Sequence, residues 1–232
     1  MQHLENVLTS EEIQIFKNYW NEHNSQSYIN AFATVNHPSK ERANHIDRRL
    51  LIVPDSEPYN ILKRLVEQYF PVDTYFWANY QRQSMGHQLH VDEYGKNRQE
   101  PTWTIILALD TEPKFKAIIF KDLCNSCDEM YQMLFDRQKN SQKVSNITEV
   151  EDLEHNIPEL CDYMELDGIF EYKAGCGVLF DTNQVHCSSH WTKYPEFKYR
   201  DLVQLHIGIS SKDSYEEDIQ SERGETIPNY HI

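Results

Sequence analysis

His90-Val91-Asp92 is the stretch that decides the fold of this 232-residue chain, because it places an imidazole and a carboxylate two positions apart. Residues two apart on a β-strand point to the same face, so His90 and Asp92 can reach one metal ion while Val91 points away. The third ligand must then come from a distant strand. The run Gly-Cys-Gly-Val-Leu-Phe-Asp at residues 175–181 leads to His186, which offers a second imidazole. Two imidazoles and one carboxylate on one side of a metal form a facial triad that leaves the other side open.

Two helices are predicted before the strands begin. Thr9 can cap the first helix, Glu12 completes a capping box three residues later, and the helix is expected to run to about residue 21. The second helix is expected from Tyr59 to Tyr69, behind Pro58, because its apolar residues recur with the spacing of a helix.

From Thr74 onward the apolar pattern indicates strands instead of helices. Strands are expected at residues 74–81, 88–92, 103–109, 117–120, 170–172, 177–180 and 202–209. Helices first and strands afterwards predict a mainly β fold with flanking helices, a jelly roll or double-stranded β-helix of the cupin type. The length suits one domain over residues 1–232, since single β-domains often reach this size.

Several motifs give the chain a resemblance to the 2-oxoglutarate- and Fe(II)-dependent oxygenases, most of all to their prolyl 4-hydroxylase-like and phytanoyl-CoA hydroxylase-like branches. The motifs follow one another over most of the chain: the opening at 8–13, Tyr80 and Gly86 before the His-x-Asp, the apolar run 103–109, and the run 177–180 before the distal histidine. The resemblance implies an enzyme that uses Fe(II), 2-oxoglutarate and O2. It also implies hydroxylation of an unactivated C–H bond, with release of succinate and CO2.

The resemblance assigns His90, Asp92 and His186 to the iron. His190 remains an alternative distal ligand, because its distance of ten residues to Arg200 is nearer the usual prolyl-hydroxylase interval than the fourteen from His186. The order of motifs favours His186, which follows the run 177–180 as the distal ligand does in the family.

The resemblance also implies that Arg200 anchors the distal carboxylate of 2-oxoglutarate. A planar, permanently charged guanidinium can bind a carboxylate through two parallel hydrogen bonds, which suits a dicarboxylic co-substrate. Tyr80 is expected to add a hydroxyl hydrogen bond to the same carboxylate. The loop between the distal histidine and Arg200 is longer than in most of the family.

A cupin-type metal-dependent isomerase, or a metal-binding module without 2-oxoglutarate chemistry, is the alternative function. Arg200 favours the oxygenase, because the alternative has no need of a buried dicarboxylate anchor. The expected substrate is a peptide or protein side chain, or else a small metabolite, and the oligomeric state stays open.

Composition restricts the partners and the compartment. The net charge of −15 repels a phosphate backbone and counts against a nucleic-acid partner. No apolar stretch approaches the roughly 20 residues of a membrane-spanning helix, and no secretory signal is visible at the start. With an odd count of five cysteines, reduced thiols in the cytoplasm are expected.

Residues 121–170 are predicted to form an acidic insertion, which holds four basic and twelve acidic residues. Helical pieces are expected near 128–137 and 149–153, and the insertion is either a lid over the active site or a peripheral decoration. Cys124 and Cys127 are ordinary thiols or, with Cys161 and His155, zinc ligands. A polar tail begins at about residue 211.

Overall fold

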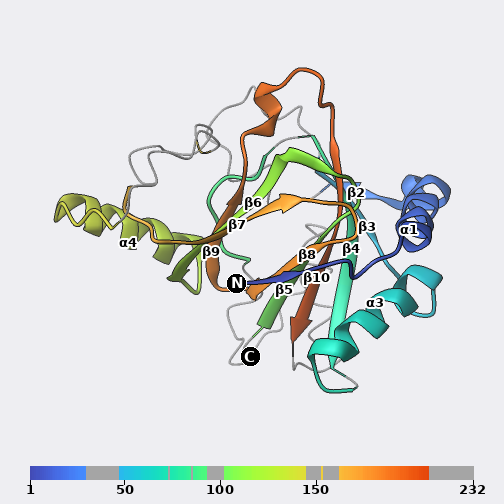
Figure 1. The fold of residues 1–232 in the computed structure, drawn as a ribbon. Helices are drawn as coiled ribbons and strands as arrows, with labels where there is room; N and C mark the ends of the chain where they lie inside the picture. The colour runs from blue at the N-terminus through green and yellow to red at the C-terminus, as the bar shows by residue number, and fades with distance from the viewer. Residues whose placement is uncertain are drawn as a thin grey trace, which may run out of the picture.

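The computed structural model describes residues 1–29, 47–72, 74–84, 86–92, 102–144, 153 and 162–208. In these residues a seven-stranded sheet lies against a three-stranded sheet, and the pairs are antiparallel (Figure 1). The large sheet has the order β1 (Gln2–Leu4), β8 (Gly177–Asp181), β5 (Thr102–Ala108), β10 (Arg200–Gly208), β4 (Tyr75–Gln83), β3 (Asp47–Leu51) and β2 (Tyr28–Ile29). The small sheet has the order β7 (Leu166–Tyr172), β6 (Glu112–Leu123) and β9 (Gln184–Ser188). The predicted double-stranded β-helix is confirmed.

Helices α1 (Ser10–His23) and α3 (Glu57–Tyr69) cover the outer face of the large sheet (Figure 1). The predicted capping box is present: the Glu12 amide donates to Thr9 Oγ1 at 3.2 Å, and the Thr9 amide donates to Glu12 Oε2 at 2.9 Å. Helix α3 begins after Ser56, whose hydroxyl accepts the Tyr59 amide, and its apolar face is buried against the sheet.

We expect Thr9→Ala to destabilise the protein by about 1 kcal/mol, because it leaves an amide of the first turn without its side-chain acceptor. Urea unfolding followed by circular dichroism measures the change. Ser10→Ala is the matched control at the neighbouring position, and an equal loss in that variant would contradict the assignment of Thr9 as the cap.

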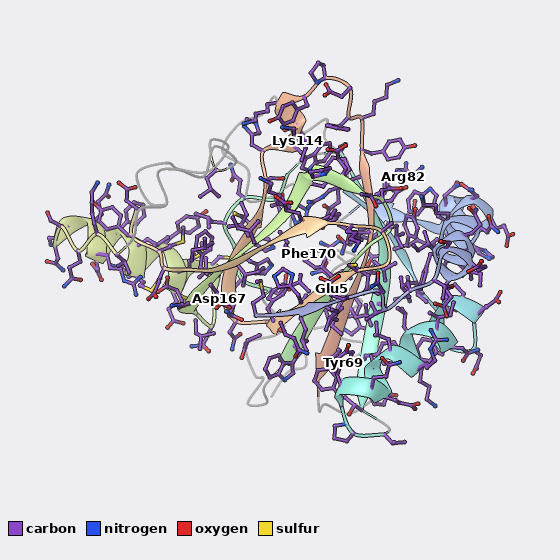
Figure 2. All side chains as sticks on the ribbon, in the orientation of Figure 1. Glu5, Tyr69, Arg82, Lys114, Asp167 and Phe170 are labelled. Carbon is purple, nitrogen blue, oxygen red and sulfur yellow. The ribbon has the colours of Figure 1, made fainter. Side chains whose placement is uncertain are left out.

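The central strands are buried on both faces and follow the two-residue period of a strand. On β10, Val203, Leu205 and Ile207 pack towards the helices, whereas Leu202 joins the cluster between the two sheets. Phe170 of β7 belongs to the same inner cluster (Figure 2). The inner face of β4 and β10 also carries buried polar side chains: Asn79, Gln81, Gln83, Arg200, Gln204 and His206.

The strand predicted at residues 88–92 is wrong. This segment pairs with β9 at one position only, where the amides and carbonyls of His90 and His186 bond each other at 3.0 and 2.9 Å. Two residues later the Asp92 amide bonds the carbonyl of Thr182 instead, so the segment turns away from β9. The prediction also missed β9, a five-residue strand in which Val185 and Cys187 alternate with polar residues and point into the cluster beneath α4.

At the two ends of the predicted insertion, β6 continues to Leu123 and β7 begins at Leu166. The helical piece predicted at 128–137 is confirmed by α4 (Cys127–Lys139), which projects from the sheets (Figure 1). Its buried residues Met130 and Leu134 pack in the cluster that contains Val91, on the side of the chain opposite the His90 and Asp92 side chains. The piece at 149–153, except for residue 153, and the tail from 211 lie outside the described residues. That the insertion is a lid therefore stays a prediction.

Among the described helices, none has both the length and the apolar character needed to cross a membrane.

Candidate metal centre

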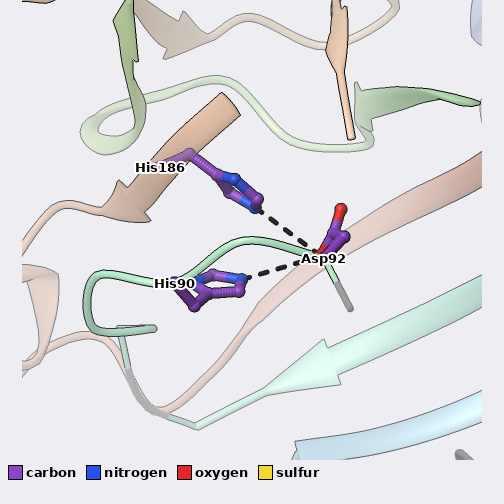
Figure 3. Close-up of side chains that lie close together, drawn as sticks. All are labelled: His90, Asp92 and His186. Atoms are coloured by element: carbon purple, nitrogen blue, oxygen red, sulfur yellow. Dashed lines mark ion pairs between the residues drawn. The ribbon is translucent and has the colours of Figure 1, made fainter. Parts of the chain in front are cut away.

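His90, Asp92 and His186 come together at one point of the structure (Figure 3). Their ligand atoms all lie within 4.8 Å of one another, and no second such group of histidine, cysteine and acidic side chains occurs in the part of the chain that the structure describes. Nε2 of His90 lies 3.8 Å from Asp92 Oδ1, and Nε2 of His186 lies 3.7 Å from the same oxygen. Each of the three side chains thus offers one atom to a shared position.

Backbone pairing explains why residues so far apart in sequence meet. His186 lies on β9, and the single bridge between His90 and His186 fixes the two backbones side by side. Val91 points into the apolar cluster beneath α4, so the neighbouring side chains of His90 and Asp92 point the other way. The alternation that the sequence predicted therefore holds at these three residues, although they do not form a regular strand.

Both imidazoles are oriented by the same local contact. Nδ1 of His90 lies 2.7 Å from the carbonyl of Gln88, and Nδ1 of His186 lies 2.8 Å from the carbonyl of Gln184. A carbonyl can only accept, so each Nδ1 donates a hydrogen bond to it and each Nε2 is the ring nitrogen turned towards Asp92. Metal-binding histidines are held in this way, with the other ring nitrogen donating to a carbonyl or carboxylate.

The two oxygens of the Asp92 carboxylate have different surroundings. Oδ1 faces both imidazoles, whereas Oδ2 accepts the Thr104 hydroxyl at 2.9 Å and the Gln204 amide at 3.4 Å. His206 Nδ1 lies 4.0 Å from the same Oδ2. This arrangement presents one carboxylate oxygen to a metal and fixes the other.

Electrostatics leave His90 and Asp92 ready to bind a cation at neutral pH. Burial, reinforced by the nearby His186, lowers the pKa of His90 to about 3, so the ring is neutral. Burial alone would raise the pKa of Asp92, but the imidazoles of His186, His206 and His90 and the Thr104 hydroxyl outweigh it and lower the pKa. Because His90 is neutral and Asp92 is ionised, neither group has to lose a proton when a divalent metal binds.

Arg200 is buried between the two sheets at the start of β10, with 4% of its surface exposed. Its Nε donates to Gln83 Oε1 at 2.7 Å, and the guanidinium carbon lies 5.2 Å from the ring centre of Tyr172 and 6.0 Å from that of Trp191. These contacts are with neutral groups. By the two-residue period Arg200 shares its face of the strand with Gln204, which contacts Asp92.

Tyr80 does not belong to this group, so the expectation that it adds a hydroxyl beside Arg200 is corrected. Its ring stacks on Trp20 of α1 with the centroids 4.9 Å apart, on the helix-covered face of the large sheet. Strand alternation is the physical reason, because Tyr80 and Gln81 must point to opposite faces. The inward positions belong to Gln81 and Gln83, to which the sequence analysis assigned no role.

His190 does not join the ligand group either. Strand β9 ends at Ser188, and His190 precedes the short helix η5 (Trp191–Lys193), so it does not share the strand face of His186. His206 of β10 lies beside Asp92 and packs on Trp77 with the ring centroids 4.4 Å apart.

Cys124 lies in the apolar cluster beneath Val91 and Cys127 packs against it, and neither is part of a disulfide. Burial, together with nearby acidic groups, raises the pKa of Cys124 to about 11, which disfavours the thiolate that zinc requires. The other two expected zinc ligands, His155 and Cys161, lie outside the described residues.

Comparison with known proteins relates this architecture to solved structures. No protein-family model matches the sequence, and a search of curated proteins finds no match. A prolyl-4-hydroxylase from Pseudomonas putida is similar with a TM-score of 0.53 and 12% identity, over 90% of this chain and 92% of that one. The non-heme alpha ketoglutarate dependent carbocyclase SnoK from nogalamycin biosynthesis gives 0.54 and 14%, over 93% and 84%. The epimerase SnoN, solved with Fe3+, alpha ketoglutarate and nogalamycin RO, gives 0.51 and 10%, over 99% and 86%. This chain therefore has the double-stranded β-helix fold of the 2-oxoglutarate- and Fe(II)-dependent oxygenases.

Proposed function

We propose that this protein is a non-haem Fe(II)- and 2-oxoglutarate-dependent dioxygenase. The observation that carries the proposal is the convergence of His90 Nε2, Asp92 Oδ1 and His186 Nε2 on one position. Two imidazoles and one carboxylate with open positions opposite them are the ligand set of non-haem Fe(II) oxygenases. When bound, Fe(II) with 2-oxoglutarate and O2 would supply the oxidation of a C–H bond, with release of succinate and CO2.

Arg200 supports 2-oxoglutarate as the co-substrate. It lies on the inner face of the large sheet, four residues along β10 from Gln204, which is about 13 Å of strand. A dicarboxylate bound to the metal at one end would extend along this face towards Arg200, whose long side chain would meet the other end. Bidentate hydrogen bonds from a buried arginine would then fix the distal carboxylate.

The remaining residues of the interior would keep the site dry and oriented. Phe180 packs on the His186 ring with the centroids 4.8 Å apart, and Phe115, Tyr172 and Trp191 form the apolar wall near Arg200. A dry interior strengthens the attraction between a guanidinium and a carboxylate. These side chains bind and shield and need not exchange protons.

The substrate we propose is a peptide or protein side chain, or a small metabolite, that becomes hydroxylated. The acidic insertion favours a basic or neutral substrate over an acidic one. Similar folds also serve in a carbocyclase and an epimerase, so the outcome of the oxidation depends on how a substrate is placed. Cytoplasmic localisation is proposed because an odd count of five cysteines fits reduced thiols better than a disulfide framework.

Anaerobic titration of the Fe(II)-loaded protein with 2-oxoglutarate tests the proposal. We expect a weak visible charge-transfer absorption band that saturates with 2-oxoglutarate, and slow formation of succinate once O2 is admitted. Asp92→Ala should lose both signals, because the metal loses its anionic ligand. A metal-loaded protein that shows neither the band nor succinate would favour the cupin-type isomerase or binding module.

A further inference from the structure

A continuous chain of buried hydrogen bonds joins Arg200 to Asp92. Arg200 Nε donates to Gln83 Oε1 at 2.7 Å, and Gln83 Nε2 donates to Gln81 Oε1 at 2.7 Å. Gln81 Nε2 donates to Gln204 Oε1, and Gln204 Nε2 donates to Asp92 Oδ2 at 3.4 Å. Three amides thus connect the proposed dicarboxylate anchor with the carboxylate of the metal centre.

The two ends force one direction on this glutamine chain, which we define as Gln83, Gln81 and Gln204. A guanidinium can only donate hydrogen bonds and an ionised carboxylate can only accept them. Each amide must therefore turn its oxygen towards Arg200 and its NH2 towards Asp92. Turning one amide over would place two donors or two acceptors against each other. The three dipoles consequently point the same way, with their positive ends towards the carboxylate.

Burial makes the chain sensitive to any break. The glutamines are 0%, 2% and 6% exposed at positions 81, 83 and 204, so solvent gives little replacement for a lost partner. Aligned hydrogen bonds in such surroundings strengthen one another, and an unsatisfied buried amide is costly. The register of the sheet builds this arrangement: Gln83 lies opposite Arg200, and Gln81 lies opposite Leu202, between Arg200 and Gln204 along β10.

We propose that the glutamine chain is a relay of positioning residues that couples Arg200 to Asp92. At one end Gln83 accepts the Nε hydrogen bond and so fixes the orientation of the Arg200 guanidinium. At the other end Gln204 holds Asp92 Oδ2, which keeps Oδ1 turned towards the imidazoles. That the relay couples metal binding to dicarboxylate binding rests on the proposed function. Its effect on the metal affinity of the protein alone does not.

Metal binding by the protein alone provides the test, with Mn(II) as the probe and electron paramagnetic resonance as the readout. Gln83→Met touches the Arg200 end and has no contact with Asp92 in the chain. We expect it to weaken Mn(II) binding about fivefold without any 2-oxoglutarate, because the remaining amides lose their fixed direction. Gln81→Met, which contacts neither end, should weaken binding by a similar factor. The double variant should be no weaker than either single one, since one chain can be broken only once.

Ser189→Ala is the matched control, because it removes a buried neutral hydrogen-bonding side chain that takes no part in the relay. It should leave Mn(II) affinity unchanged, and thermal unfolding shows whether each variant remains folded. Unchanged Mn(II) affinity in both Gln83→Met and Gln81→Met would overturn the relay, even if 2-oxoglutarate bound more weakly. A wild-type protein that binds Mn(II) but no 2-oxoglutarate would contradict the proposed function. The relay would still be decided by the Mn(II) affinities of the glutamine variants.

Discussion

Replacing His186 by alanine is expected to weaken Fe(II) or Mn(II) binding by at least about a hundredfold and to abolish turnover. Changes to residues that merely orient a metal ligand already cost 10- to 100-fold, so loss of a ligand should cost no less. The fold should survive, because β9 pairs with β6 through backbone atoms and the bridge to His90 also uses only backbone atoms. Metal titration followed by electron paramagnetic resonance measures the loss, and circular dichroism checks the fold.

The matched control for this variant is His190→Ala. His190 lies beyond the end of β9, outside the three residues whose ligand atoms converge. Metal affinity in His190→Ala should stay within about twofold of the wild-type value, since the triad remains complete. A large loss of metal in His190→Ala, with binding retained in His186→Ala, would show that the distal ligand is His190.

Arg200→Met is expected to raise the Kd for 2-oxoglutarate about a hundredfold while leaving a metal-binding protein. Removing one partner of a buried, hydrogen-bonded charge pair costs roughly 2–5 kcal/mol, which corresponds to about 30-fold or more in affinity. Methionine keeps much of the length and apolar volume of the arginine stem, so the contacts with Tyr172 and Trp191 suffer least. Competition binding to the Mn(II) protein, or the visible band of the anaerobic Fe(II) protein, measures the Kd.

Arg82→Met supplies the same chemical change on the opposite face of the neighbouring strand. Arg82 forms a two-point ion pair with Asp201 at 2.8 and 2.7 Å and lies over the Trp20 ring, on the helix side of the large sheet (Figure 2). The Arg82→Met variant should be somewhat less stable than the wild type and should bind 2-oxoglutarate with unchanged affinity. Equal losses of affinity in Arg82→Met and Arg200→Met would show that the effect comes from charge or stability and that Arg200 is no specific anchor.

The proposed ligands His90 and Asp92 could be predicted from the sequence because their two-residue spacing is a local property. The parity of His90 and Asp92 depends only on the geometry of an extended chain, and it holds although the segment forms a single bridge instead of a strand. For the distal ligand the sequence left two candidates, His186 and His190, which have the same chemistry and differ only in their spacing from the neighbouring motifs. The end of β9 at Ser188 separates them, and strand ends are set by hydrogen-bond partners elsewhere in the chain.

Which polar residues point into the interior could not be predicted from the sequence. Tyr80 was assigned to the interior from its place in the motif order, but β4 points it at Trp20 and points Gln81 and Gln83 inward. Along β4, one set of alternate residues faces the helices and the other faces the space between the two sheets. Both faces of β4 are buried, so the hydrophobic pattern alone does not say which face is which.

The sequence alone was enough to predict the mainly β fold, the two helices that open it, His90 and Asp92 as candidate metal ligands, and Arg200 as a candidate anchor. These follow from local periodicity, capping and side-chain chemistry, which are properties of a few neighbouring residues. Only the tertiary structure decided that His186 completes the triad, that Tyr80 faces the helices, and that three glutamines join Arg200 to Asp92. Those contacts depend on strand register and on which face of a doubly buried sheet turns inward, and both are fixed by the packing of the whole chain.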